Sequence, residues 1–304
     1  MKFNYLKYKD DIIPIYLQDN KKDTTFLFLH GLNSSSDFIN LIKEMPHNFN
    51  VVALNFPGSI YWKELKPEEI KLEDWIEVAK IVLKNIKSKK IVIVAHSMAG
   101  GVAVELASDK RVKKIVMLST INPSMQYTKG YKTLKSVIGD FETQKPSFLG
   151  QLIMFGAKFT KKGRRLLDSF SRKGRWYNLL ANYVLNPEFM KNLDKKYHEA
   201  AEKLVFVIGD KDGVIGTEAF LKYAEELNRP AMKIGTTHSP LYTVPSAMNN
   251  FLNHLIPTKK RFWFTRFVTF SKKTIDIKPS DNSEDIKEAK ELKELINDTT
   301  QQGE

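Results

Sequence analysis

The chain has 304 residues, no cysteine and a formal net charge of +13. The absence of cysteine excludes disulfides, a cysteine nucleophile and thiolate metal sites. Hydrophobic residues make up 42% of the chain, an ordinary share for a globular protein, and the length accommodates one large α/β domain with an insertion. Because the sequence shows neither a long apolar span nor a signal-peptide pattern after Met1, we expect a cytoplasmic protein.

Strand-like and helix-like segments alternate from the N-terminus onward. Alternating hydrophobicity over 3–9 and 12–17 predicts a hairpin that turns at Asp10 and Asp11. Helices are predicted over 72–86 and 101–108. Short apolar segments predict strands over 24–29, 50–55, 90–95, 114–118, 203–208 and 231–234. We therefore predict an α/β fold with a mostly parallel, twisted sheet and helices on both of its faces.

The predicted strand over 90–95 leads directly into small residues around a single serine. Ser97 has Ala95 two residues before it and Ala99 two residues after it. A nucleophile on a strained strand-to-helix turn needs small residues at these positions, because the strand and helix backbones approach closely there. The pattern departs from G-x-S-x-G, and a serine that only caps a helix also fits it.

Two later loops carry the partners that a nucleophilic serine needs. Asp210 and Asp212 follow the predicted strand over 203–208, and His238 follows the strand over 231–234. A neutral imidazole takes and returns a proton near neutral pH, so we predict His238 as the general base. A carboxylate must then fix the tautomer of the imidazole and balance its charge. We favour Asp212 for this role, and the alternatives are Asp210 or a turn-forming role for the aspartate.

Four motifs together resemble the α/β-hydrolase superfamily, in its esterase/lipase branch with a helical cap. They are Phe28-Leu29-His30-Gly31, the turn around Ser97, the acid loop 209–212 and His238-Ser239-Pro240. The resemblance runs from Phe3 to Leu255 and implies a triad of Ser97, Asp212 and His238, in the chain order nucleophile, acid, base.

The resemblance also implies how the rest of the site is built. The backbone N–H groups of Leu32 and Met98 are expected to form an oxyanion hole, and their side chains to shape the acyl pocket. His30, Gly31 and His96 are expected beside the substrate, with neither histidine acting as the base. A serine at position 97 argues against epoxide hydrolase and dehalogenase chemistry, which in this superfamily uses an aspartate there.

The longest interval without a predicted strand gives the domain organisation. It runs over 123–202, where the resembling enzymes carry a cap, so we predict a helical lid there. The hydrolase core then comprises 1–122 and 203–257, and a C-terminal tail comprises 258–304. A helical surface excursion without a gating role is the alternative for the interval.

Basic and aromatic residues are interleaved in the predicted lid, over 155–177, and in the tail, over 259–273. This mixture suits peripheral contact with an anionic membrane, and the alternative is that the rings pack inward. Without a recognised nucleic-acid-binding module we expect no nucleic-acid partner. Beyond Pro279 the tail becomes acidic and polar, and 283–296 is predicted as one marginal helix.

We expect neither a metal ion nor a cofactor, because no metal-ligand spacing and no glycine-rich phosphate loop is present. The predicted function is a serine hydrolase that cleaves small-molecule or lipid esters through an acyl-enzyme on Ser97. An acyltransferase, a thioesterase or a peptidase with the same triad is an alternative. A second alternative is a non-catalytic protein that binds a membrane or a partner. The sequence does not indicate the oligomeric state.

Overall fold

The computed structural model describes residues 3–256 and 275–277 and is built around one nine-stranded sheet. The strand order is β1-β2-β4-β3-β5-β6-β7-β8-β9. The pairs β1–β2 and β2–β4 are antiparallel, and every other pair is parallel. The strands are β1 (Phe3–Tyr8), β2 (Asp11–Gln18), β3 (Thr24–Leu29), β4 (Asn50–Leu54), β5 (Lys90–His96), β6 (Val112–Leu118), β7 (Leu204–Ile208), β8 (Ala231–Ile234) and β9 (Ile275–Ile277).

The N-terminal hairpin forms as predicted, but its turn lies one residue earlier. Tyr8 pairs with Asp11, so Lys9 and Asp10 make the two-residue turn. Lys9 has a φ of 50°, the positive value that tight hairpin turns require. The prediction of a turn at Asp10 and Asp11 was therefore wrong by one position.

The central strands are buried on both faces, which explains their continuous apolar sequences. Along β3, Leu27 and Leu29 belong to one hydrophobic cluster, whereas Phe26 and Phe28 belong to a second cluster on the other side. This alternation follows from the two-residue period of a strand. The sheet thus separates two apolar cores.

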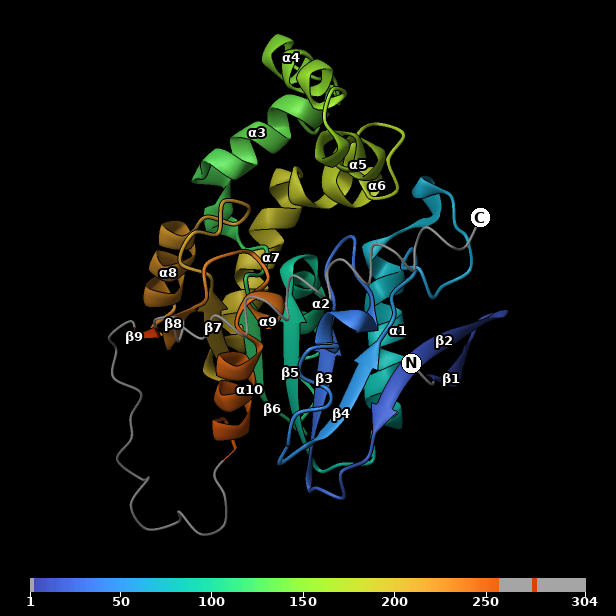
Figure 1. Ribbon diagram of the computed structural model, residues 1–304, viewed down its shortest axis with the longest axis vertical. Coiled ribbons are helices and arrows are strands. Elements are labelled where there is room, and N and C mark those ends of the chain that lie inside the picture. The colour runs from blue at the N-terminus through green and yellow to red at the C-terminus, as the bar shows by residue number, and fades with distance from the viewer. Residues whose placement is uncertain (1–2, 257–274, 278–304) are drawn as a thin grey trace.

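Different helices cover the two faces of the sheet (Figure 1). The first core is closed by α1 (Leu72–Asn85), α2 (Gly100–Glu105), α7 (Pro187–Ala200) and α8 (Thr217–Glu226). The second is closed by a short helix over Ser36–Ile39 together with α9 (Pro240–Thr243) and α10 (Pro245–His254). The fold is therefore the predicted three-layer α/β arrangement.

The segment between β6 and β7 consists of helices joined by turns and loops. It contains a short helix over Pro123–Tyr127, then α3 (Lys129–Ile138), α4 (Phe148–Ala157), α5 (Lys161–Phe170), α6 (Tyr177–Leu179), a further turn of helix over Leu180–Val184, and α7. Helices α3 to α6 project beyond one end of the sheet, whereas α7 returns alongside it (Figure 1). We call α3 to α6 the cap.

None of the described helices is long and apolar enough to cross a membrane. The basic and aromatic segment 259–273 and the predicted helix 283–296 lie outside the described residues.

Candidate active site

Ser97 occupies a sharp turn between β5 and the short helix over Ser97–Ala99 that leads into α2. Its φ is 55°, a left-handed value that is rare for a residue with a side chain. Ala95 and Ala99 are fully buried beside it. A Cβ atom on Gly31 would lie 2.7 Å from the Cβ of Ser97, so only glycine fits there. The chain thus accommodates strain at this serine, as the sequence pattern indicated.

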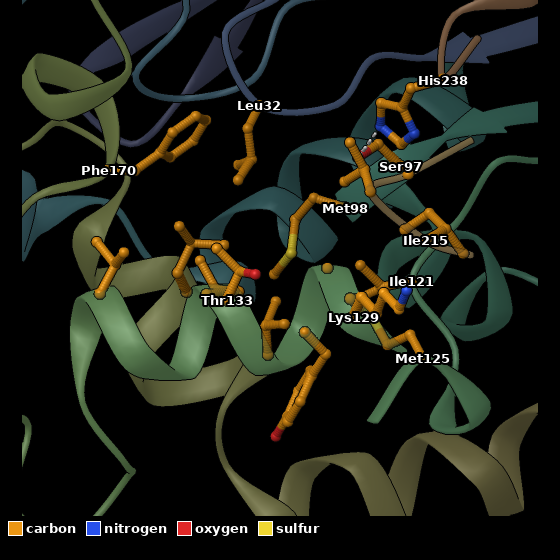
Figure 2. Close-up of a pocket in the computed structure, with 18 of the residues that line it drawn as sticks. Leu32, Ser97, Met98, Ile121, Met125, Lys129, Thr133, Phe170, Ile215 and His238 are labelled. Carbon is orange, nitrogen blue, oxygen red and sulfur yellow. Dashed lines mark hydrogen bonds between the residues drawn. The ribbon is translucent and has the colours of Figure 1, made fainter. Parts of the chain in front are cut away.

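The three predicted catalytic side chains, those of Ser97, His238 and Asp212, are connected by two hydrogen bonds. His238 Nε2 lies 3.0 Å from Ser97 Oγ, and His238 Nδ1 lies 2.9 Å from Asp212 Oδ2. Because the carboxylate only accepts, Nδ1 carries the proton and Nε2 is free to accept the serine proton. Figure 2 shows His238 directly over Ser97 at one end of the cavity.

The Asp212 side chain has no solvent exposure, yet it is held as a carboxylate. Burial alone would raise the pKa of Asp212, but the hydrogen bond with His238 and two backbone N–H groups outweigh it and hold that pKa below its usual value. The backbone donors are Val214 and Ile215, at 2.9 and 3.1 Å from Oδ1. A fixed negative charge therefore faces the imidazole.

Asp210, the alternative acid, points elsewhere. Its carboxylate lies 3.1 Å from Lys233 Nζ and is half exposed. The structure brings only Asp212, of these two residues, to His238. The geometry thus agrees with the sequence analysis, which favoured Asp212 over Asp210.

His96 lies behind the base and not in the cavity. Its Nε2 is 2.9 Å from the backbone oxygen of His238, and since a carbonyl only accepts, Nε2 donates. Burial, followed by the nearby His238, lowers the pKa of His96 to about 3, so the ring is neutral. His96 thus holds the backbone of the loop that carries His238.

His30 supports the opposite side of the site. It is fully buried, its Nδ1 donates to the Gly31 carbonyl at 2.7 Å, and its Nε2 accepts from the Phe56 N–H at 3.0 Å. Burial lowers the pKa of His30 to about 4. His30, Gly31 and His96 are not among the residues that line the cavity, so the cavity lends no support to the expectation that they contact substrate.

A cavity of about 670 Å³ opens from Ser97 and His238 into the cap. Its walls are mainly apolar side chains of the cap and the loops below it, among them Leu32, Met98, Ile121, Met125, Phe170 and Ile215 (Figure 2). Lys129 is the lining residue with a permanent charge. The volume falls in the range of roughly 300–1,000 Å³ that is typical of small-molecule sites.

Two contacts attach the cap to the site, and no sequence pattern indicated them. The indole N–H of Trp176, in the cap, donates to the side-chain oxygen of Asn33, which follows Leu32 directly. A Cβ on Gly130, in α3, would lie 2.5 Å from the Gly213 carbonyl, so α3 touches the loop that carries Asp212. Only the folded arrangement reveals these contacts.

A serine, a histidine and a buried carboxylate that meet where parallel strands end define an α/β hydrolase. A model of the alpha/beta hydrolase fold family matches residues 24–264, and the chain belongs to that family.

Among curated proteins, the chain is 25% identical over 251 residues to "Putative esterase/lipase 2" of Mycoplasma pneumoniae, covering 80% of this chain and 92% of that protein. Among solved structures, it resembles "a putative aryl esterase from Burkholderia cenocepacia" with a TM-score of 0.56 and 17% identity, covering 84% and 97% of the two chains. A haloalkane dehalogenase from Bradyrhizobium elkani gives a TM-score of 0.62 at 14% identity, covering 84% and 97%. These structural similarities concern the fold.

Proposed function

We propose that this protein is a serine hydrolase that cleaves carboxylic esters with an apolar acyl group. The observation that carries the proposal is the hydrogen-bonded line from Asp212 through His238 to Ser97, which ends on the wall of a largely apolar cavity. The name of the relative from Mycoplasma pneumoniae, an esterase/lipase, supports the same class of reaction.

The proposed mechanism follows from the direction of the hydrogen bonds. Nε2 of His238 accepts the proton of Ser97 as Oγ attacks the ester carbonyl, and the carboxylate of Asp212 balances the imidazolium that forms. The imidazolium then returns the proton to the leaving alkoxide, and an acyl-enzyme remains on Ser97. Water activated by His238 hydrolyses this ester in the second half of the reaction.

The tetrahedral intermediate needs hydrogen-bond donors for its negative oxygen. Leu32 and Met98 both line the cavity beside Ser97, and we assign their backbone N–H groups to this role. The turn that carries Leu32 is supported by His30, which binds the Gly31 carbonyl. The arrangement requires no cofactor in the proposed steps.

The test is hydrolysis of p-nitrophenyl esters of increasing acyl length, combined with labelling by a fluorophosphonate probe. We expect wild-type protein to react with both, and Ser97→Ala to lose labelling and several orders of magnitude in turnover. The alanine methyl fits the same buried turn, so thermal unfolding serves as the control for folding. Most of the activity surviving in a normally folded Ser97→Ala protein would remove Ser97 as the nucleophile. A wild-type protein that neither reacts with the probe nor cleaves any ester would point to the non-catalytic alternative.

A further inference from the structure

The outer surface of the cap carries an apolar helix that nothing in the described structure covers. Helix α4 lies at the end of the cap that is farthest from the sheet (Figure 1). Its sequence, FLGQLIMFGA, contains no charged residue. Phe148 is 77% exposed, Leu149 59%, Leu152 51% and Phe155 60%, and Phe159 just beyond the helix is 73% exposed. Large apolar side chains gathered in this way usually mark an interaction surface.

The helix is firmly attached on its other side. A Cβ on Gly150 would lie 1.8 Å from the Ser136 carbonyl of α3, so the two helices are in contact there. The Ser147 N–H donates to the same carbonyl at 2.9 Å, and the Ser147 side chain caps α4 by accepting from the Gly150 N–H. The exposed side chains are therefore carried by a helix, α4, that is held in place by its contacts with α3.

Over 143–167, the stretch that contains α4, every charged residue is basic, and the acidic residues that bound this stretch are Glu142 and Asp168. Between 143 and 167 the sequence has no acidic residue, and its basic residues are Lys145, Lys158, Lys161, Lys162, Arg164 and Arg165. Within the described part of the chain, Lys158, Lys161, Arg164 and Arg165 are exposed and form no ion pair with an acidic group. Apolar side chains next to unpaired cations complement a surface that combines hydrocarbon with negative charge.

We propose that α4 and the cations beside it form a docking surface for an anionic lipid bilayer. A helix of ten residues is too short to cross a membrane and suits a position along its interface. A second copy of this chain is the less favourable occupant. In a two-fold contact the cations from Lys158 to Arg165 would face their own counterparts and repel.

The same helix forms part of the cavity wall. Ile153, Met154 and Ala157 of α4 line the cavity that leads to Ser97, whereas Phe148 and Phe155 face outward. Docking would thus place the cavity beside the acyl chains of the bilayer. This part of the inference rests on the proposed function, and it specifies the substrate as an acyl ester drawn from a membrane.

The test compares full-length proteins in co-sedimentation with vesicles of phosphatidylcholine, with and without phosphatidylglycerol. The docking variant is Phe148→Gln/Leu152→Gln/Phe155→Gln, because glutamine keeps helix propensity and these three side chains do not line the cavity. The matched control is Tyr5→Thr/Ile12→Thr/Leu17→Thr, which replaces three exposed apolar side chains on the hairpin β1–β2. Hydrolysis of p-nitrophenyl acetate in solution reports on the catalytic site in each protein.

We expect wild type and control to bind the anionic vesicles and the docking variant to bind them at least about tenfold more weakly. Binding should weaken at high salt, and Lys158→Gln/Lys161→Gln should lower it by a factor of about five for each charge. Equal binding of docking variant and wild type would overturn the proposal. A wild-type dimer that the docking variant converts to a monomer, with no vesicle binding by either, would also overturn it in favour of a second copy.

The experiment can contradict the docking surface without contradicting the enzymatic function, and the reverse. Loss of vesicle binding in the docking variant, with no ester hydrolysis by any protein, supports the docking surface and contradicts the enzymatic function. Unchanged vesicle binding in the docking variant, with normal hydrolysis of p-nitrophenyl acetate, supports the enzyme and contradicts the docking surface.

Discussion

Two aspartates only two residues apart have different surroundings, and these decide which of them can assist His238. Asp212 is buried, accepts from two backbone N–H groups and lies 2.9 Å from the imidazole. Asp210 is half exposed and paired with Lys233. Asp212 is therefore placed to hold one tautomer of His238. Asp210 forms only an ion pair at the surface, where solvent screens the charges.

We therefore expect Asp212→Asn to lower turnover on the order of a thousandfold or more, because the amide can donate to Nδ1 and favour the wrong tautomer of His238. Asp210→Asn is the matched control, and it should cost about tenfold or less. Steady-state kinetics with a p-nitrophenyl ester, together with unfolding curves, compare the two variants. The opposite ranking would assign the acid to Asp210.

The placement of single residues was predictable to different degrees. Ser97 and His238 have distinctive neighbours in the sequence, a tight turn of small residues and a loop after a strand. The roles of His30 and His96 are set by carbonyl and N–H groups that come from elsewhere in the chain. No sequence pattern encodes such contacts, so these two histidines were expected beside the substrate, whereas they are not among the residues that line the cavity.

At the scale of elements, the side chain of Trp176 connects the cap to the turn that carries Leu32. Trp176 is buried against the ring of Trp75, with centroids 5.9 Å apart, and its N–H holds Asn33. Asn33 has a φ of 52°, a strained value that asparagine tolerates better than most residues. The contact thus fixes a backbone conformation next to Leu32.

Trp176→Phe should keep most of the packing and remove the donor. We expect kcat to fall by about three- to tenfold, and the free energy of unfolding to fall by about 1–2 kcal/mol from the unmade hydrogen bond. Trp62→Phe, on a ring that packs against Tyr8, is the control for the same change of side chain. If Trp176→Phe lowers stability but leaves kcat and KM as in wild type, the cap does not support the turn that carries Leu32.

Elements were predictable where hydrophobic periodicity is strong. The strands over 24–29 and 231–234 were predicted with the bounds that the structure gives them, and the helix from Leu72 was predicted one residue too long. The outward face of α4 was not predictable. A continuous apolar sequence has no polar side to show which face is covered, and only the packing of Gly150 on α3 decides it.

At the scale of the whole molecule, the sheet assembles the site from distant segments. Ser97 follows β5, Asp212 follows β7 and His238 follows β8, and these parallel strands all end at the same edge. Ligand sites in open α/β sheets form at this edge, which is why the order of strands and loops in the sequence was enough to predict a shared site. The order in which the strands pair depends on long-range packing and had to be observed.

The two buried histidines predict that the protein loses stability in mild acid. Burial lowers the pKa of His30 to about 4 and that of His96 to about 3, whereas each returns to about 6.5 in the unfolded chain. Well above pH 6.5 both are neutral in either state and no stability is lost. Below it the unfolded chain binds the extra protons, so the free energy of unfolding falls as the pH falls toward 4.

Each histidine should contribute roughly 3 kcal/mol to this loss at pH 4. His96→Gln isolates one of them, because the amide can still donate to the His238 carbonyl and does not titrate. Urea unfolding at several pH values should therefore give a shallower decline for His96→Gln than for wild type between pH 6.5 and 4, whatever the stability of the variant at neutral pH. Parallel curves for His96→Gln and wild type would show that His96 is not held neutral by the fold.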